Sequence, residues 1–171
     1  VMIVGFFLVK NNLIDYLRNI KVIGWTTIIF GILLYIVDKF ELNKNLEKNF
    51  TYKSALLIGL FQILSLIPGV SRSGITITAA RMLKFNRFDS AKISFLLSIP
   101  ALLGASFLGL KDLTIQNFEL SKVAIFSICF SFVFSYLTIK YFLMFIKKFS
   151  LKVFVYYRIF LSGLLFIFIY I

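Results

Sequence analysis

The chain has 171 residues, of which 60% are hydrophobic and 15% are charged, and its mean hydropathy is +0.96. A water-soluble fold of this size cannot bury so much apolar surface, so the composition predicts an all-α integral membrane protein. The 19 Lys and Arg residues outnumber the seven Asp and Glu residues, and the net charge is +12. These cations lie mostly in short segments between apolar runs, which indicates membrane topology and excludes nucleic acid as a partner.

The first 53 residues predict one complete membrane span. Residues 1–9 are read as the tail of a preceding span and residues 10–21 as a polar connection. Residues 22–37 are apolar, with Trp25 and Tyr35 near the ends, where aromatic rings favour the headgroup level, so they predict a spanning helix. A hydrophilic loop over 38–53 follows. Because the sequence opens inside an apolar stretch, we expect residues 1–171 to be one membrane domain that is N-terminally truncated.

The next segment predicts a re-entrant helix hairpin over about 54–83. Residues 54–67 are apolar until Pro68-Gly69 interrupts them, and residues 75–83 form a second short run. Fourteen helical residues reach about 21 Å, whereas the hydrocarbon core is about 30 Å thick. Neither run can cross alone, and irregular backbone at membrane depth must be buried in protein or line a wet cavity. One long kinked span across 54–83 remains the alternative.

Three further spans are predicted, over 93–110 with Pro100 inside, over 122–146 and over 153–171. With a re-entrant hairpin, the segments 38–53, 84–92 and 147–152 share one side of the membrane and hold ten Lys and Arg residues, against five on the other side. The positive-inside rule places the first group in the cytoplasm. The expected architecture is a polytopic helical bundle. Lys92 is read as a loop anchor.

The segment between the two short helices, residues 68–74 with the sequence PGVSRSG, is called the hinge. It gathers Ser71, Arg72 and Ser73 between two glycines, at a depth where charge is costly. Arginine matches phosphate oxygens with a planar fork of donors, and glycines let backbone N–H groups approach an anion. A second helix beginning at Ile75 directs its positive end toward the same place. The hinge therefore predicts a phosphate site.

A purely structural interpretation of the hinge stays open. In that interpretation Ser73 caps the second short helix, and Arg72 binds carbonyl oxygens of the broken backbone. The cations within apolar segments, Arg81, Lys140 and Arg158, are read as snorkelling or as pairing with carbonyls, with a binding role left open. Ser94 and Ser98 are read as small packing residues.

Three motifs in order give the chain a family resemblance. They are GLFQ at 59–62, PGVSRSG at 68–74 and SFLLSIP at 94–100, with Gly104-Ala105 behind. Together they resemble the second signature block of bacterial undecaprenyl-diphosphate phosphatases. The resemblance implies half of an inverted-repeat architecture, and an enzyme of the bacterial plasma membrane that hydrolyses undecaprenyl diphosphate to undecaprenyl phosphate and phosphate. This reaction recycles the lipid carrier of cell-wall peptidoglycan synthesis and is linked to bacitracin resistance, with an active site open to the periplasm.

The resemblance also implies roles for individual residues. Arg72 becomes the clamp on the diphosphate, with Ser71 and Ser73 as catalytic phosphate ligands; serine or water remains open as the nucleophile. Substrate binding falls to Gly69, Gly74, Thr76 and Gln62, although Gln62 also suits an interhelical hydrogen bond. Expected partners are the polyprenyl diphosphate substrate and membrane lipids, and a homodimer stays open.

Two motifs that the resemblance implies for the reaction are missing from this sequence. Family members carry an (E/Q)xxxE motif and a serine-rich stretch ending in Gly-His on an earlier hairpin, and this chain has neither motif and no histidine. All seven carboxylates fall in predicted loops. No metal ligand is assigned within the chain, and the divalent cation that the family implies, Mg²⁺ or Ca²⁺, is expected to take its ligands largely from a missing N-terminal part. The isolated segment is expected to be nearly inactive.

Other functions were weighed against this one. A membrane transporter or lipid-phosphate-binding module also builds sites from broken helices, and it predicts binding without phosphate release. The acid-phosphatase-like lipid phosphatases require histidines that are absent here. A structural membrane subunit leaves the Ser-Arg-Ser cluster unexplained.

Overall fold

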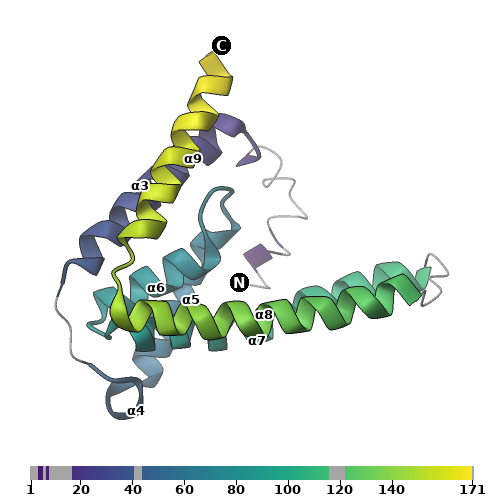
Figure 1. Cartoon of the computed structure of the whole chain (residues 1–171), viewed down its shortest axis with the longest axis horizontal. Coiled ribbons are helices and arrows are strands. Elements are labelled where there is room, and N and C mark those ends of the chain that lie inside the picture. The colour runs from purple at the N-terminus through teal and green to yellow at the C-terminus, as the bar shows by residue number, and fades with distance from the viewer. Residues whose placement is uncertain (1–3, 6, 8–16, 41–43, 116–121, 171) are drawn as a thin grey trace.

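A computed structural model describes residues 4, 5, 7, 17–40, 44–115 and 122–170. The named helices of this part are α3 (Ile20–Asp38), α4 (Leu46–Asn49), α5 (Tyr52–Ile63), the 3₁₀ turn η1 (Leu64–Leu66), α6 (Arg72–Met82), α7 (Arg87–Ile115), α8 (Lys122–Lys148) and α9 (Lys152–Tyr170). Figure 1 shows α3 and α9 packed as one pair, with α7 and α8 extending away from them and α5 and α6 near the crossing. The expected all-α fold is confirmed, and no strand occurs among the described residues.

In the described part of the chain, four helices are long and apolar enough to cross a bilayer. They contain Ile20–Asp38, Arg87–Phe107, Lys122–Lys148 and Lys152–Ile169. On α8 almost every apolar side chain is exposed, including Phe126 and Phe132. Hydrocarbon is the solvent in which such a surface is stable, so the chain is a multi-pass membrane protein. The four complete spans predicted from hydropathy are thereby confirmed; the expected tail of a preceding span falls mainly outside the described residues.

The two short helices pack against each other, because the chain reverses at Pro68-Gly69. α6 lies in the middle of the bundle, in contact with α3, α5 and α7, and every residue from Ile75 to Arg81 is buried. Its 11 residues reach only about 16 Å along the helix axis. The reversal and the shortness of α6 are what a re-entrant hairpin needs, while its position in a bilayer stays a prediction.

Two helix starts differ from the predictions by three residues or more. α6 begins at Arg72 and not at Ile75, because Ser71 caps it. α7 begins at Arg87, so Lys92 lies inside a helix and the prediction of a loop over 84–92 was wrong beyond its first three residues. The side chain of Asn86 accepts a hydrogen bond from the Asp89 N–H at 2.8 Å, which is the cap that begins this helix. The start of α7 was not recognised in the sequence because the first turn of this helix is charged.

A buried carboxylate joins the elements at the end of α6 remote from the hinge. Asp38, 2% exposed, closes α3 and accepts hydrogen bonds from Arg87 Nε at 2.6 Å and from the Leu151 N–H at 3.1 Å. Arg81 donates to the carbonyls of Asp38 and Phe85, each at 3.1 Å, as its carbonyl-pairing prediction required. This ion cluster therefore fixes α3, α6, α7 and the turn before α9 relative to one another.

Candidate functional site

The hinge is a tight turn pressed against α3. Gly69 has a φ of +88°, in the left-handed region that favours glycine. A Cβ at Gly69 would collide with Thr26 Oγ1 and would lie 2.6 Å from the carbonyl oxygen of Ile23. Only a residue without a side chain lets the hinge approach the α3 backbone this closely.

Hydroxyls of α3 hold the hinge in this position. Thr26 Oγ1 lies 2.7 Å from the Pro68 carbonyl oxygen and 2.8 Å from the Val22 carbonyl, to either of which it can donate. Thr27 Oγ1 donates to the Gly69 carbonyl at 3.3 Å. Backbone carbonyls freed by the broken helix are thus satisfied by side chains, as burial in an apolar medium requires.

Ser71 begins α6 and holds its first turn. Its Oγ accepts a hydrogen bond from the Gly74 N–H at 3.1 Å and lies 3.2 Å from Ser73 Oγ. The capping residue is therefore Ser71, and the structural interpretation that gave this role to Ser73 was wrong. The N–H groups of the first helical turn have no acceptor within the helix and, with the helix dipole, favour an anion at this end.

Arg158 reaches the hinge from α9. Its Nη2 donates to the Gly69 carbonyl at 2.8 Å, and its Nη1 lies 3.0 Å from the point that a Cβ on Gly74 would occupy. The side chain is 9% exposed, and no described carboxylate pairs with it. A buried guanidinium with one carbonyl partner keeps further N–H donors, which suit the oxygens of an anion.

Arg158 and the hinge enclose a cavity of about 510 Å³, called the loop cavity, between α3, α6 and α9. Its polar lining comes from Thr27, Ser71, Ser73, Tyr157 and Arg158, together with the hinge glycines, and the rest is apolar. The arrangement places hydroxyls, a cation and a helix N-terminus around one space. Such a space can hold a phosphate group next to an apolar chain.

Arg72 points into a second hollow. This hydroxyl groove, of about 630 Å³, lies between α7 and α8 and takes Ser94, Ser98, Ser135 and Thr138 into its lining. Ser73 lines both the hydroxyl groove and the loop cavity, so the two hollows meet at the first turn of α6. Ser73 therefore borders both the hollow lined by Arg158 and the hollow lined by Arg72.

The structure divides the predicted site residues into two groups. Gly69, Ser71, Ser73 and Gly74 line the loop cavity, with Arg72 beside them in the hydroxyl groove. Thr76 and Gln62 are buried and line neither hollow.

Thr76 has structural partners for its hydroxyl. Its Oγ1 lies 2.9 Å from the Arg72 carbonyl oxygen and 2.6 Å from Ser94 Oγ. This geometry suits positioning of α6 against α7. Any contact of Thr76 or Gln62 with substrate stays a prediction.

Sequence reasoning did not place Arg158 in the site. Its only signal was a cation within the apolar run of α9, and nothing local in the sequence says that this run packs against α3 and the hinge. Only the tertiary structure places Arg158 beside the hinge.

The described residues do not fit a divalent cation. Mg²⁺ and Ca²⁺ prefer carboxylate oxygens, and no cluster of three or more acidic, histidine or cysteine side chains occurs in the described part of the chain. The lining of the loop cavity contains no carboxylate. Asp38, the buried carboxylate, is bound by Arg87 at the other end of α6. We therefore derive no catalytic step through a metal ion.

Comparison with known proteins identifies the family. The family described as "Bacitracin resistance protein BacA" matches residues 1–164. Proteins named undecaprenyl-diphosphatase are similar over nearly the whole chain. One from Pelagibacter ubique (strain HTCC1062) is 57% identical over 99% of this chain and 67% of its own length. One from Saccharophagus degradans (strain 2-40) is 42% identical over 93% and 60%, respectively, and one from Alteromonas mediterranea (strain DSM 17117) is 43% identical over 99% and 64%.

The chain thus spans about two thirds of the length of these relatives. The family match covers the whole hinge, both arginines and every residue that lines the loop cavity. The resemblance found in the three sequence motifs is confirmed. This chain belongs to the bacitracin resistance protein BacA family.

Proposed function

We propose that the protein hydrolyses undecaprenyl diphosphate to undecaprenyl phosphate and inorganic phosphate, and so recycles the lipid carrier of cell-wall synthesis. The observation that carries this proposal is the convergence of Arg158, the hinge serines and the N-terminus of α6 on the loop cavity. These groups recognise phosphate, and the apolar remainder of the cavity suits a lipid. The names of the relatives supply the reaction.

The hinge geometry suggests how the two arginines share the two phosphates of the substrate. Arg72 and Arg158 lie on two sides of Ser73, so a diphosphate near Ser73 can meet one guanidinium at each phosphate. Cations placed where negative charge develops stabilise phosphoryl transfer. In hydrolysis an oxygen bonds to the terminal phosphorus, the bridging P–O bond breaks, and undecaprenyl phosphate leaves as the anion.

The nucleophile is a hydroxyl or water. Ser71 Oγ is occupied as the acceptor for the Gly74 N–H, which makes it a poorer candidate than Ser73 or a water molecule. No described side chain is a conventional base beside these serines, since the chain has no histidine and the loop cavity is without a carboxylate lining. We expect the proton acceptor, and the ligands of any divalent cation, to come from outside the described residues.

We further propose that the protein lies in the bacterial plasma membrane with the hairpin re-entrant and the site open to the periplasm. The excess of Lys and Arg on the predicted cytoplasmic segments supports this orientation. A homodimer remains an open expectation.

The test is phosphate release from undecaprenyl diphosphate in detergent with Mg²⁺. The complete gene product is compared with its Arg72→Ala variant and with Lys140→Ala, a matched loss of a cation from α8 outside both hollows. We expect Arg72→Ala to lower kcat by about 100-fold or more, because it removes a group that binds developing charge, and Lys140→Ala to leave it unchanged. Lipid binding without any release by the wild type would instead support a transporter or lipid-phosphate-binding module.

A further inference from the structure

A third hollow runs along α8 beside the start of α9. This aromatic groove, of about 950 Å³, is lined chiefly by apolar side chains, among them Phe134, Phe142, Phe145, Phe149, Val153 and Phe154. Its α8 residues extend over 14 helical steps, from Phe134 to Lys148, which is about 21 Å. The aromatic groove is therefore long and mainly apolar.

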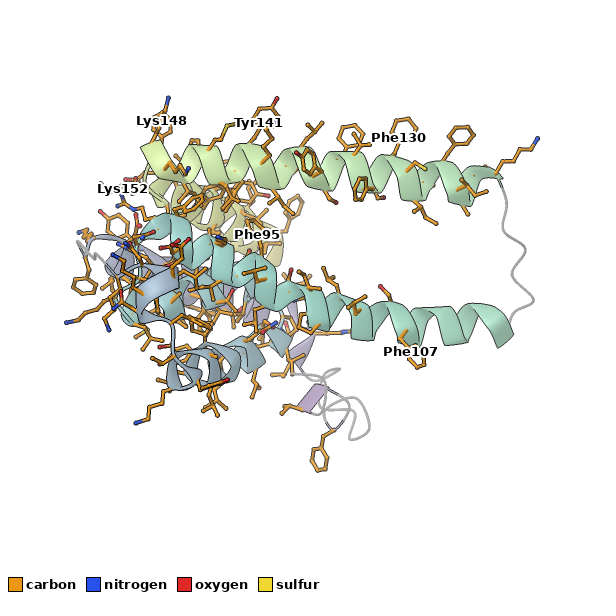
Figure 2. All side chains as sticks on the ribbon, turned by 90° about the horizontal axis from the view of Figure 1, so that it is seen from below. Phe95, Phe107, Phe130, Tyr141, Lys148 and Lys152 are labelled. Carbon is orange, nitrogen blue, oxygen red and sulfur yellow. The ribbon has the colours of Figure 1, made fainter. Side chains whose placement is uncertain are left out.

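The aromatic groove is continuous with the candidate site. Phe142 and Phe154 line both the aromatic groove and the loop cavity, and their ring centroids are 5.2 Å apart. Phe95 of α7 stands against Phe142 at 5.6 Å, and Figure 2 shows its side chain on the side of α7 that faces α8. An apolar chain whose phosphate lies beside Arg158 meets this wall of aromatic rings first.

The hydroxyl groove is the more polar of the two exits from the site. It carries Ser94, Ser98, Ser135 and Thr138 together with the Arg72 side chain, among apolar residues that include Phe95, Leu102 and Ile139. The two cations of the aromatic groove, Lys147 and Lys148, lie at its far end, where the Nζ of Lys147 stands over the ring of Phe88 of α7 at 4.4 Å. The two hollows share Phe134 and Thr138, but the aromatic groove has more rings and fewer hydroxyls, which favours it for the apolar part of a substrate.

We propose that the aromatic groove binds the isoprene units nearest the diphosphate, with the phosphate bonded to the lipid beside Arg158 and the terminal phosphate toward Arg72. This assignment rests on the proposed function. The tail comes from membrane hydrocarbon and not from water, so its binding depends on close packing, and the rings of Phe142, Phe145 and Phe154 supply flat walls for its branched units. The terminal phosphate then leaves through the hydroxyl groove.

Photolabelling tests the position of the tail directly. The probe is farnesyl diphosphate with a diazirine at the end of its prenyl chain, used on the complete gene product in detergent. We expect label in the segments 134–149 and 153–154, reduced by excess undecaprenyl diphosphate. Label confined to other helices, or label in the groove that undecaprenyl diphosphate does not displace, would overturn the assignment.

A matched pair of substitutions tests the same assignment by kinetics. Val153→Trp fills the aromatic groove, whereas Val133→Trp adds the same volume at an exposed valine of α8 outside it. We expect Val153→Trp to raise KM for undecaprenyl diphosphate by about tenfold, the scale of a misfit in an apolar pocket, and Val133→Trp to leave KM unchanged. Equal KM for the two variants contradicts the proposal.

The experiments can refute the hydrolase proposal and the tail-site proposal independently of each other. Phosphate release by the wild type with label outside the aromatic groove removes the tail site alone. Displaceable label within the groove without phosphate release removes the hydrolase and keeps the lipid site.

Discussion

Gly69→Ala should be the most informative single substitution in the hinge. The change adds one carbon atom, yet that atom would collide with Thr26 Oγ1 and approach the Ile23 carbonyl oxygen to 2.6 Å. The backbone of α3 cannot move away cheaply, because α3 packs on both α6 and α9. The hinge has to shift instead.

The cost of this shift can be worked from the contacts. An alanine at φ +88° loses about 1–2 kcal/mol in backbone conformation. A displaced hinge also loses the hydrogen bonds from Thr26 to Pro68 and from Thr27 to Gly69, each about 1 kcal/mol. The sum is about 3–4 kcal/mol, which corresponds to a fall of about 10 °C in Tm for a protein of this size.

The assay is thermal unfolding of the complete gene product in detergent, with Gly59→Ala as the control. Gly59 lies within α5, and a Cβ added there would meet nothing within 4 Å. Alanine favours a helix over glycine by about 0.5–1 kcal/mol, so Gly59→Ala should raise Tm slightly. If Gly69→Ala unfolds at the same temperature as Gly59→Ala, the close approach of hinge and α3 is wrong.

Three further substitutions test other contacts, each by thermal unfolding in the same detergent. Asp38→Asn leaves the guanidinium groups of the ion cluster without their carboxylate and should cost about 3 kcal/mol; an unchanged Tm would contradict the cluster. Ser71→Ala removes the cap of α6 and should cost about 1 kcal/mol, whereas Ser73→Ala should not, and equal losses would return the cap to Ser73. Thr76→Val leaves the buried Ser94 hydroxyl without its partner at 2.6 Å and should cost about 1–2 kcal/mol; no loss would refute its positioning role.

The spans could be predicted because a bilayer imposes their length. Residues 22–37 and 122–146 stand out by hydropathy alone, and the helices found there extend the predicted ranges by at most two residues at either end. The hinge could be predicted in the same way, since Pro-Gly in an apolar run leaves two pieces that are too short to cross. Local chemistry decides these features.

Helix starts and cross-helix contacts could not be predicted. Ser71 and Ser73 are both good capping residues, and the choice depends on which hydroxyl reaches the Gly74 N–H. Arg158 is 89 residues from Gly69 in the sequence, and Asp38 is 113 from Leu151. Such pairs arise from tertiary packing, above all that of α9 on α3, which no local pattern encodes. The same packing brings Arg158 to the hinge that carries Arg72.

The most direct test of this convergence is a double-mutant cycle on phosphate release from undecaprenyl diphosphate. kcat/KM is measured for Arg72→Ala, Arg158→Lys and the double variant of the complete gene product, each shown to be folded by its Tm. Arg158→Lys keeps a charge beside Gly69 but loses the planar fork. If both arginines act on one diphosphate, each single variant is impaired and the double variant loses clearly less than the product of the two losses. Full activity of Arg158→Lys, or losses that multiply, would contradict a shared site.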